Sequence, residues 1–89
     1  MRTPSETNSA HDGTQKLYYF DNGYGASVVC HQYSYGGSKG LWELAVLSKT
    51  DDGYQIDYST EITNDVEGNL TVKDVESLLD RIAVLPTKG

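Results

Sequence analysis

Cys30 and His31 stand side by side and are the residues of this chain that most suggest nucleophilic or metal chemistry. Ala26, Val28 and Cys30 alternate as in a strand, and adjacent strand residues point to opposite faces, so Cys30 and His31 cannot share one site. A zinc site needs three or four convergent ligands, which this chain does not offer. We therefore predict no catalytic residue and no metal site, and we expect Cys30 to be buried and inert.

Two loops resemble ligand-binding motifs only in part. The segment Gly36–Gly40 carries Lys39, but it lacks the spacing of a phosphate loop and leads into a strand rather than a helix N-terminus. The segment Asn64–Asn69 offers oxygen ligands, but Val66 occupies a ligand position of the calcium loop. We predict a flexible strand connection and a polar turn at these places, no cofactor, and no enzymatic activity, because no nucleophile, base and orienting group can be assembled.

The seven tyrosines are more informative. Tyr19, Tyr54 and Tyr58 are expected in the core or at its edge, whereas others lie in or beside loops rich in glycine and serine. Tyrosine with glycine and serine is typical of adaptable binding surfaces, because the ring gives contact area at low entropic cost. Alternatively, these rings lie flat over the edge of a small core. The first interpretation predicts a partner-binding site made of Tyr24, Tyr33, Tyr35, Gly36, Gly37 and Lys39.

The net charge of −6 is unevenly distributed along the chain. Residues 1–50 are neutral overall, and residues 51–89 carry the whole excess of acids. Binding to nucleic acid through phosphates requires clustered lysine and arginine, so direct binding is not expected. The acidic half is either a solvated surface that keeps the protein soluble or a charged interaction face.

The cysteine content and hydropathy indicate the compartment. One cysteine cannot form an internal disulfide, whereas short secreted domains usually carry several. No apolar run approaches the ~18 residues of a membrane span, and the polar N-terminus lacks the apolar region of a signal peptide. We expect a cytosolic protein with no membrane partner.

Alternating apolar residues and turn residues predict an antiparallel sheet. The Asn22-Gly23 dipeptide is a strong hairpin signal, and Asp51–Gly53 predicts a second hairpin turn. The predicted strands are Lys16–Phe20, Ala26–Gln32, Leu41–Ser48 and Tyr54–Tyr58. Within the third, the face with Trp42, Leu44 and Val46 is expected in the core, because the opposite face carries Glu43.

A C-terminal helix has the clearest signals. Thr71 is a plausible N-cap, and Asp74 sits three residues later, as in a capping box. Pro86 ends the helix. The apolar stripe consists of Val75, Leu78, Leu79, Ile82 and Leu85.

The elements together predict an α+β protein: a two-layer fold in which one C-terminal helix packs on a four-stranded antiparallel meander sheet. Residues 1–15 contain almost nothing to bury and are predicted to be a flexible N-terminal tail. Residues 16–86 form a single domain, and residues 87–89 are a C-terminal tail.

Four segments resemble a group of small uncharacterised proteins encoded by tailed phages and prophages. They are Phe20–Val29, Ser34–Gly37, Gly40–Leu47 and Ile62–Val66, and the resemblance covers roughly residues 18–85. It implies a phage or prophage origin and a place in the host cytoplasm. It implies no activity and no catalytic residue.

We therefore expect a phage-encoded accessory protein that binds a host or phage protein through its tyrosine- and glycine-rich loops. One alternative is a structural protein that self-associates, for example as a homodimer, through an exposed sheet face or edge strand. Another is an acidic-surface decoy or inhibitor of a host nucleic-acid-binding protein.

Overall fold

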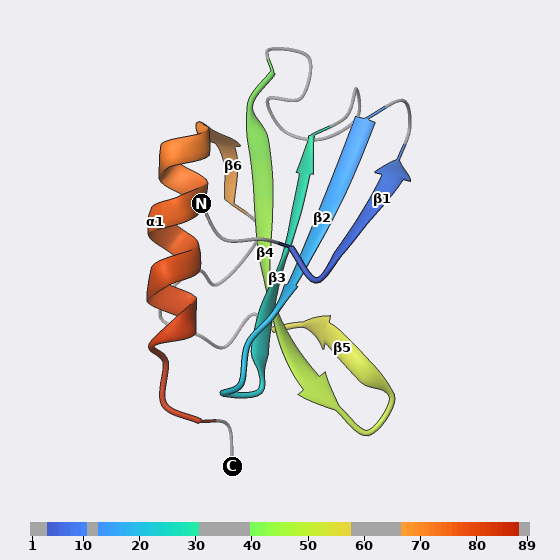
Figure 1. The fold of residues 1–89 in the computed structure, drawn as a ribbon, viewed down its shortest axis with the longest axis vertical. Helices are drawn as coiled ribbons and strands as arrows, with labels where there is room; N and C mark the ends of the chain where they lie inside the picture. Colours follow the sequence, from blue (N-terminus) through green and yellow to red (C-terminus); the bar gives the residue numbers. More distant parts are fainter. Residues whose placement is uncertain (1–3, 11–12, 31–39, 58–66, 88–89) are drawn as a thin grey trace.

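The structure is a computed structural model, and it describes residues 4–10, 13–30, 40–57 and 67–87. This part of the chain forms an antiparallel sheet with one helix packed on one face (Figure 1). The elements are β1 (Glu6–Ala10), β2 (Gly13–Tyr19), β3 (Tyr24–Cys30), β4 (Trp42–Thr50), β5 (Gly53–Ile56), β6 (Glu67–Leu70) and α1 (Val72–Ala83).

The strands follow the order β1-β2-β3-β4-β5, and every neighbouring pair is antiparallel. The long strand β4 has two partners on its outer side. Its far end pairs with β5, where Lys49 lies opposite Tyr54, and its near end pairs with β6, where Trp42 lies opposite Leu70. Two short strands thus share one position in the sheet.

The α+β class is confirmed, but the prediction of four strands is wrong. β1 and the first residues of β2 lie within residues 1–15, which the sequence predicted to be a tail. The side chains of Glu6–Ser9 are exposed, so this edge strand is held by its backbone ladder to β2 and has no apolar alternation to reveal it. The second unpredicted strand, β6, has only four residues, and Asn69 within it adopts a left-handed backbone conformation, with a φ of 57°.

The helix begins as predicted. The Thr71 hydroxyl accepts from the Asp74 amide at 3.2 Å, and the Asp74 carboxylate accepts from the Thr71 amide at 3.1 Å, which completes a capping box. Val75, Leu79 and Ile82 are buried against the sheet. The amphipathic stripe therefore docks the helix, and the cap fixes where it starts.

One core lies between α1 and the strands β2, β3 and β4. The predicted core face of β4 is confirmed, since Leu44 and Val46 are fully buried and Trp42 packs at the margin. Cys30, the last residue of β3, is only half-buried and lies outside the core cluster, so the prediction that it is buried is wrong. The buried cluster consists of Tyr18, Ala26, Val28, Leu44, Val46, Val75, Leu79 and Ile82.

Candidate binding surfaces

Tyr24 is the one residue of the predicted partner-binding site that lies within the described part of the chain. Its ring is half-buried and packs against the core, and its amide donates to the Asn22 side chain at 3.0 Å. Tyr24 therefore has a structural contact of its own. Tyr33, Tyr35, Gly36, Gly37 and Lys39 lie outside the described residues, as do Tyr58 and residues 64–66 of the predicted polar turn, while residues 67–69 of that turn belong to strand β6.

Asn22 joins the β2–β3 turn to the end of the helix, a contact that the turn motif alone does not predict. It is buried, and its Nδ2 donates to the carbonyl oxygens of Ile82 at 2.9 Å, Leu85 at 3.1 Å and Ala83 at 3.3 Å. Carbonyl groups at a helix C-terminus have no partner within the helix. The Asn22 amide therefore caps the helix from a segment about sixty residues away in sequence.

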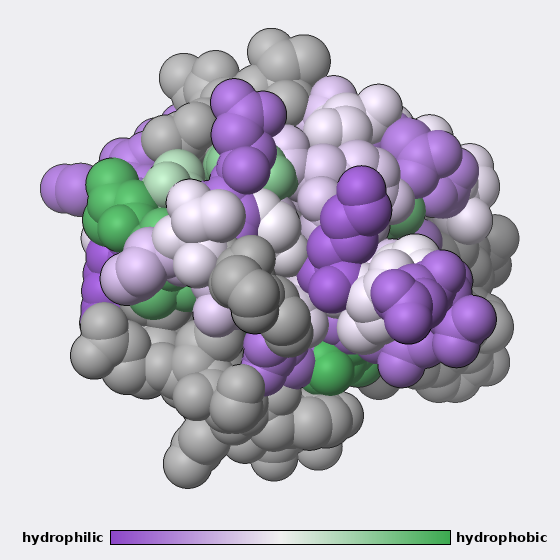
Figure 2. Space-filling model, turned by 90° about the horizontal axis from the view of Figure 1, so that it is seen from below, coloured by the Kyte–Doolittle hydropathy of each residue, from purple (hydrophilic) through white to green (hydrophobic). Residues whose placement is uncertain are grey.

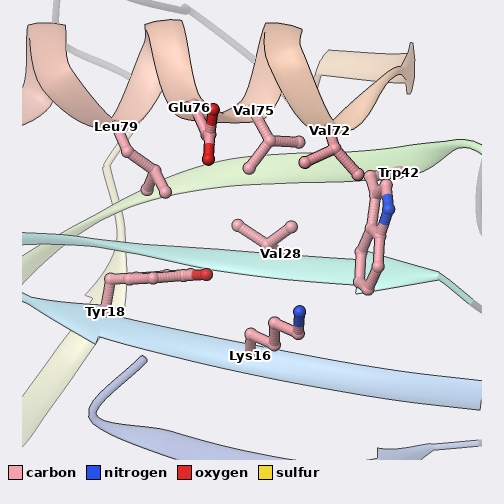
Figure 3. Close-up of a pocket in the computed structure, with 8 residues that line it drawn as sticks. All are labelled: Lys16, Tyr18, Val28, Trp42, Val72, Val75, Glu76 and Leu79. Atoms are coloured by element: carbon pink, nitrogen blue, oxygen red, sulfur yellow. The ribbon is translucent and has the colours of Figure 1, made fainter. Parts of the chain in front are cut away.

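A small pocket opens where α1 meets the sheet (Figure 3). Its cavity volume of about 20 Å³ holds a water molecule or the tip of one side chain, far less than a metabolite needs. Its lining residues are Lys16, Tyr18, Val28, Trp42, Val72, Val75, Glu76 and Leu79.

Three polar side chains line this pocket, from β2 and from the helix. The Lys16 ammonium lies 5.0 Å from the centroid of the Trp42 ring, a cation–π distance. The Tyr18 ring lies along the sheet with its hydroxyl in the pocket, below Glu76 of the helix (Figure 3). Burial, and then the negative charge of Glu76, raise the pKa of Tyr18 above its ordinary value. At neutral pH its hydroxyl is therefore protonated.

A second surface lies on the sheet face that α1 does not cover. Tyr19 of β2 and Tyr54 of β5 stack there with ring centroids 4.4 Å apart and an interplanar angle of 23°. Ile56 lies on the same face, and it is 47% exposed, while Tyr19 is 37% exposed. We name the set Tyr19, Tyr54 and Ile56 the tyrosine face.

The tyrosine face rests on a thin apolar layer. Leu47, which lies opposite Ile56 in β5, is buried on this face, outside the core beneath the helix. Gly25 of β3 lies opposite Tyr19, and a Cβ there would come within 3.4 Å of Tyr19 Cδ1. The residue at this position is a glycine because a Cβ would also lie 2.3 Å from the Tyr18 carbonyl oxygen.

Polar contacts also fix the Tyr19 ring. Its hydroxyl donates to the Glu6 carboxylate of β1 at 2.8 Å. This hydrogen bond raises the pKa of Tyr19 above its ordinary value. Burial and the negative charge of Glu6 raise it further. Two strands thus hold the ring in a fixed, partly exposed orientation, which is what a contact residue requires.

The prediction that Tyr19 and Tyr54 lie in the core or at its edge is wrong, since neither packs with the core beneath the helix and both lie on the opposite face of the sheet. Of the neighbours Tyr18 and Tyr19, Tyr18 is the core residue, and the alternation of side chains along a strand then directs Tyr19 to the opposite face. No local signal decides between Tyr18 and Tyr19, because Lys16, a charged residue, shares the face of Tyr18; in the structure the Lys16 ammonium lies 5.0 Å from the centroid of the Trp42 ring.

The rest of the described surface is less distinctive. Seen from the end that is lowest in Figure 1, it is mainly hydrophilic, with separate hydrophobic patches (Figure 2). Among the described residues, no three His, Cys, Asp or Glu side chains gather to hold a metal ion, and no helix is long and apolar enough to cross a membrane. Comparison with protein-family models, with curated proteins and with solved structures gives no match.

Proposed function

We propose that this protein acts by binding another protein through its tyrosine face and performs no chemistry of its own. The observation that carries the proposal is the Tyr19–Tyr54 stack beside the exposed Ile56, on the sheet face opposite the helix. Tyrosine is enriched at binding hot spots because its ring desolvates well and loses little entropy on binding. Both rings are already stacked, so a partner meets a preorganised surface.

The charges around this face indicate the chemistry of the partner. Glu6 contacts Tyr19 directly, and Asp51 and Asp52 are exposed in the turn that leads into β5. Lys49, opposite Tyr54, is the basic residue closest to them in the ladder. With a chain charge of −6, the complementary surface is an apolar patch with lysine and arginine at its rim.

The setting of this interaction follows from the resemblance of the chain to small proteins of tailed phages and prophages. On that basis the protein is a phage accessory factor that meets its partner in the cytoplasm of the bacterial host. The loop residues Tyr33, Tyr35, Gly36, Gly37 and Lys39, together with Tyr24, remain proposed as a further part of the contact surface.

The proposal is tested by photo-crosslinking followed by affinity measurement. Ile56 is replaced by p-benzoylphenylalanine in bacterial cells, and Val84, which is 79% exposed beyond the end of the helix, carries the same group as a matched control. We expect a specific protein adduct from position 56 and none from position 84.

The adduct identifies the partner, whose affinity is then measured with purified proteins. Tyr54→Ala should raise Kd by roughly 30-fold, as for an aromatic hot spot, and Val84→Ser should leave Kd unchanged. Added salt should weaken the wild-type complex, because the rim is charged. A Tyr54→Ala variant that folds and binds like the wild type would contradict the proposal.

A further inference from the structure

The outer edge of β1 lies open at one side of the sheet. β1 stands at one end of the strand order and pairs with β2 alone, and no described residue pairs with its other edge. Natural edge strands are usually protected by lysine, proline, a bulge or great shortness. β1 contains neither lysine nor proline, its one charged residue, Glu6, lies at its first position and is bound to Tyr19, and its five residues pair with β2 in an uninterrupted register.

The opposite side of the sheet is different. The outer edge of β4 is divided between β5 and β6, each of four residues, and the register with β6 shifts between Trp42 and Leu44. Such interruptions prevent a long pairing edge from forming. Among the described strands, the longest regular edge without a described partner is therefore on β1.

The hydrogen-bond pattern shows which residues of β1 face outward. The Phe20 amide donates to the Tyr24 carbonyl, so the backbone groups of Phe20 point toward β3. This direction alternates along a strand. Every second residue of β2, counted back from Phe20, therefore bonds to β3, and the residues between them bond to β1. Leu17 and Gln15 belong to the second group, and they lie opposite Glu6 and Asn8. The remaining residues, Thr7 and Ser9, direct their N–H and C=O groups toward the open edge.

The charge distribution favours a second copy of this chain at that edge. The acidic excess belongs to residues 51–89, whereas the described parts of β1 and β2 carry only Glu6 and Lys16, one charge of each sign. Two copies that meet edge to edge at β1 keep the acidic helix α1, which packs on β3, β4 and β6, away from the junction. The repulsion between the two helices is therefore small in this arrangement.

We propose that two copies of this protein pair through β1, in antiparallel orientation about a two-fold axis normal to the sheet. The register that uses the whole strand places Asn8 opposite Asn8 of the second copy. Thr7 then exchanges backbone hydrogen bonds with Ser9 of the second copy, and Glu6 lies opposite its uncharged Ala10. No like charges are directly opposed in this register.

The symmetry has a consequence for binding. A two-fold axis normal to the sheet leaves both helices on one side and both tyrosine faces on the other, and the two sheets join into one. Each dimer thus presents two tyrosine faces in one direction. If the tyrosine face binds a partner as proposed above, a multimeric or repetitive partner is bound with avidity.

Disulfide trapping tests the register directly. In a Cys30→Ala background, Asn8→Cys places two thiols at a non-hydrogen-bonded pair with Cα atoms about 4.5 Å apart, within the roughly 4.4–6.8 Å that a disulfide spans. Thr7→Cys is the matched control, because Thr7 and its copy are displaced by two residues and lie roughly 8 Å apart. We expect a covalent dimer from Asn8→Cys under mild oxidation and little from Thr7→Cys.

Mass measurement in solution provides the second test. The wild type should show a concentration-dependent dimer by sedimentation equilibrium. Thr7→Pro removes an outward N–H and should raise the dimer Kd about tenfold or more, whereas Thr7→Val keeps the N–H and should dimerise normally. Tyr54→Ala should dimerise like the wild type, which separates this proposal from the tyrosine-face proposal. A wild type that is monomeric at about 1 mM, or Asn8→Cys trapping no faster than Thr7→Cys, would overturn the proposal.

Discussion

Replacing Asn22 by alanine removes the amide that joins the β2–β3 turn to the end of the helix. Nδ2 donates to three helix-terminal carbonyls at 2.9–3.3 Å, and Oδ1 accepts from the Tyr24 amide at 3.0 Å. A hydrogen bond contributes about 0.5–1.5 kcal/mol net, and a buried group left unsatisfied costs about 1–3 kcal/mol. The bond to the Ile82 carbonyl is buried, while the carbonyls of Ala83 and Leu85 have partial access to water.

These magnitudes give an expected loss of about 2–4 kcal/mol for Asn22→Ala. A chain of 89 residues has a free energy of unfolding of about 4–13 kcal/mol, so the loss is a large share of the total. Urea denaturation followed by the fluorescence of Trp42 measures it. Asp21→Ala, an exposed change in the same turn, is the control and should shift the free energy by less than about 0.5 kcal/mol.

Asn22→Asp gives a sharper form of the same test. It keeps the size and the acceptor for the Tyr24 amide but turns a carboxylate toward the carbonyls of the helix end. Since these dipoles disfavour the charged form, the pKa of the introduced carboxyl is higher in the folded than in the unfolded protein. The protonated form stabilises the fold, so stability is fullest below the unfolded pKa and is lost as pH rises through the folded pKa. An Asn22→Ala loss below about 0.5 kcal/mol would refute the link between turn and helix.

Three further predictions follow from the packing and the titrating groups. Ile82→Ala should destabilise by about 2–5 kcal/mol and Leu78→Ala by clearly less, because Ile82 is fully buried and Leu78 only partly; equal denaturation midpoints would contradict the docking of the helix. Gly25→Ala should lower the melting temperature strongly or prevent folding, since its Cβ would lie 2.3 Å from a backbone carbonyl oxygen; a wild-type melting curve would contradict this geometry. Glu6→Gln should lower the raised pKa of Tyr19 in a spectrophotometric titration. In the wild type, the contribution of the Tyr19 hydroxyl to stability should be lost as the pH rises above the unfolded tyrosine pKa. An unchanged titration in the variant would show that the hydrogen bond to Glu6 does not form in solution.

Local signals in the sequence predicted the parts of the fold that depend on local chemistry. The Thr71–Asp74 capping box and the core position of Leu44 and Val46 are both confirmed, because a cap needs only neighbouring residues and Glu43 disfavours its own face for the core beneath the helix. Ala45 and Leu47 on the face of Glu43 are nevertheless buried as well. Strand β1 was missed because the side chains of Glu6–Ser9 are exposed and the strand pairs with β2 through a backbone ladder, which leaves no mark on side-chain composition.

The candidate surfaces could not be predicted because they depend on contacts distant in sequence. Whether Tyr18 or Tyr19 faces the core is decided by the register of β2 with β3, where Tyr18 lies opposite the buried Ala26. The stacking of Tyr19 on Tyr54 further depends on the pairing of β4 with both β3 and β5, which brings the two rings to one face. Sequence alone shows the aromatic residues but not which of them meet.

The measurement that tests the central claim most directly is a nuclear magnetic resonance titration of the labelled protein with its purified partner. The account predicts shift changes at the backbone amides of Tyr19, Tyr54 and Ile56 and their strand neighbours, with the amides of α1 little affected, because the helix covers the other face of the sheet. Changes confined to α1, or to residues 31–39, would contradict the claim that the tyrosine face is the binding surface.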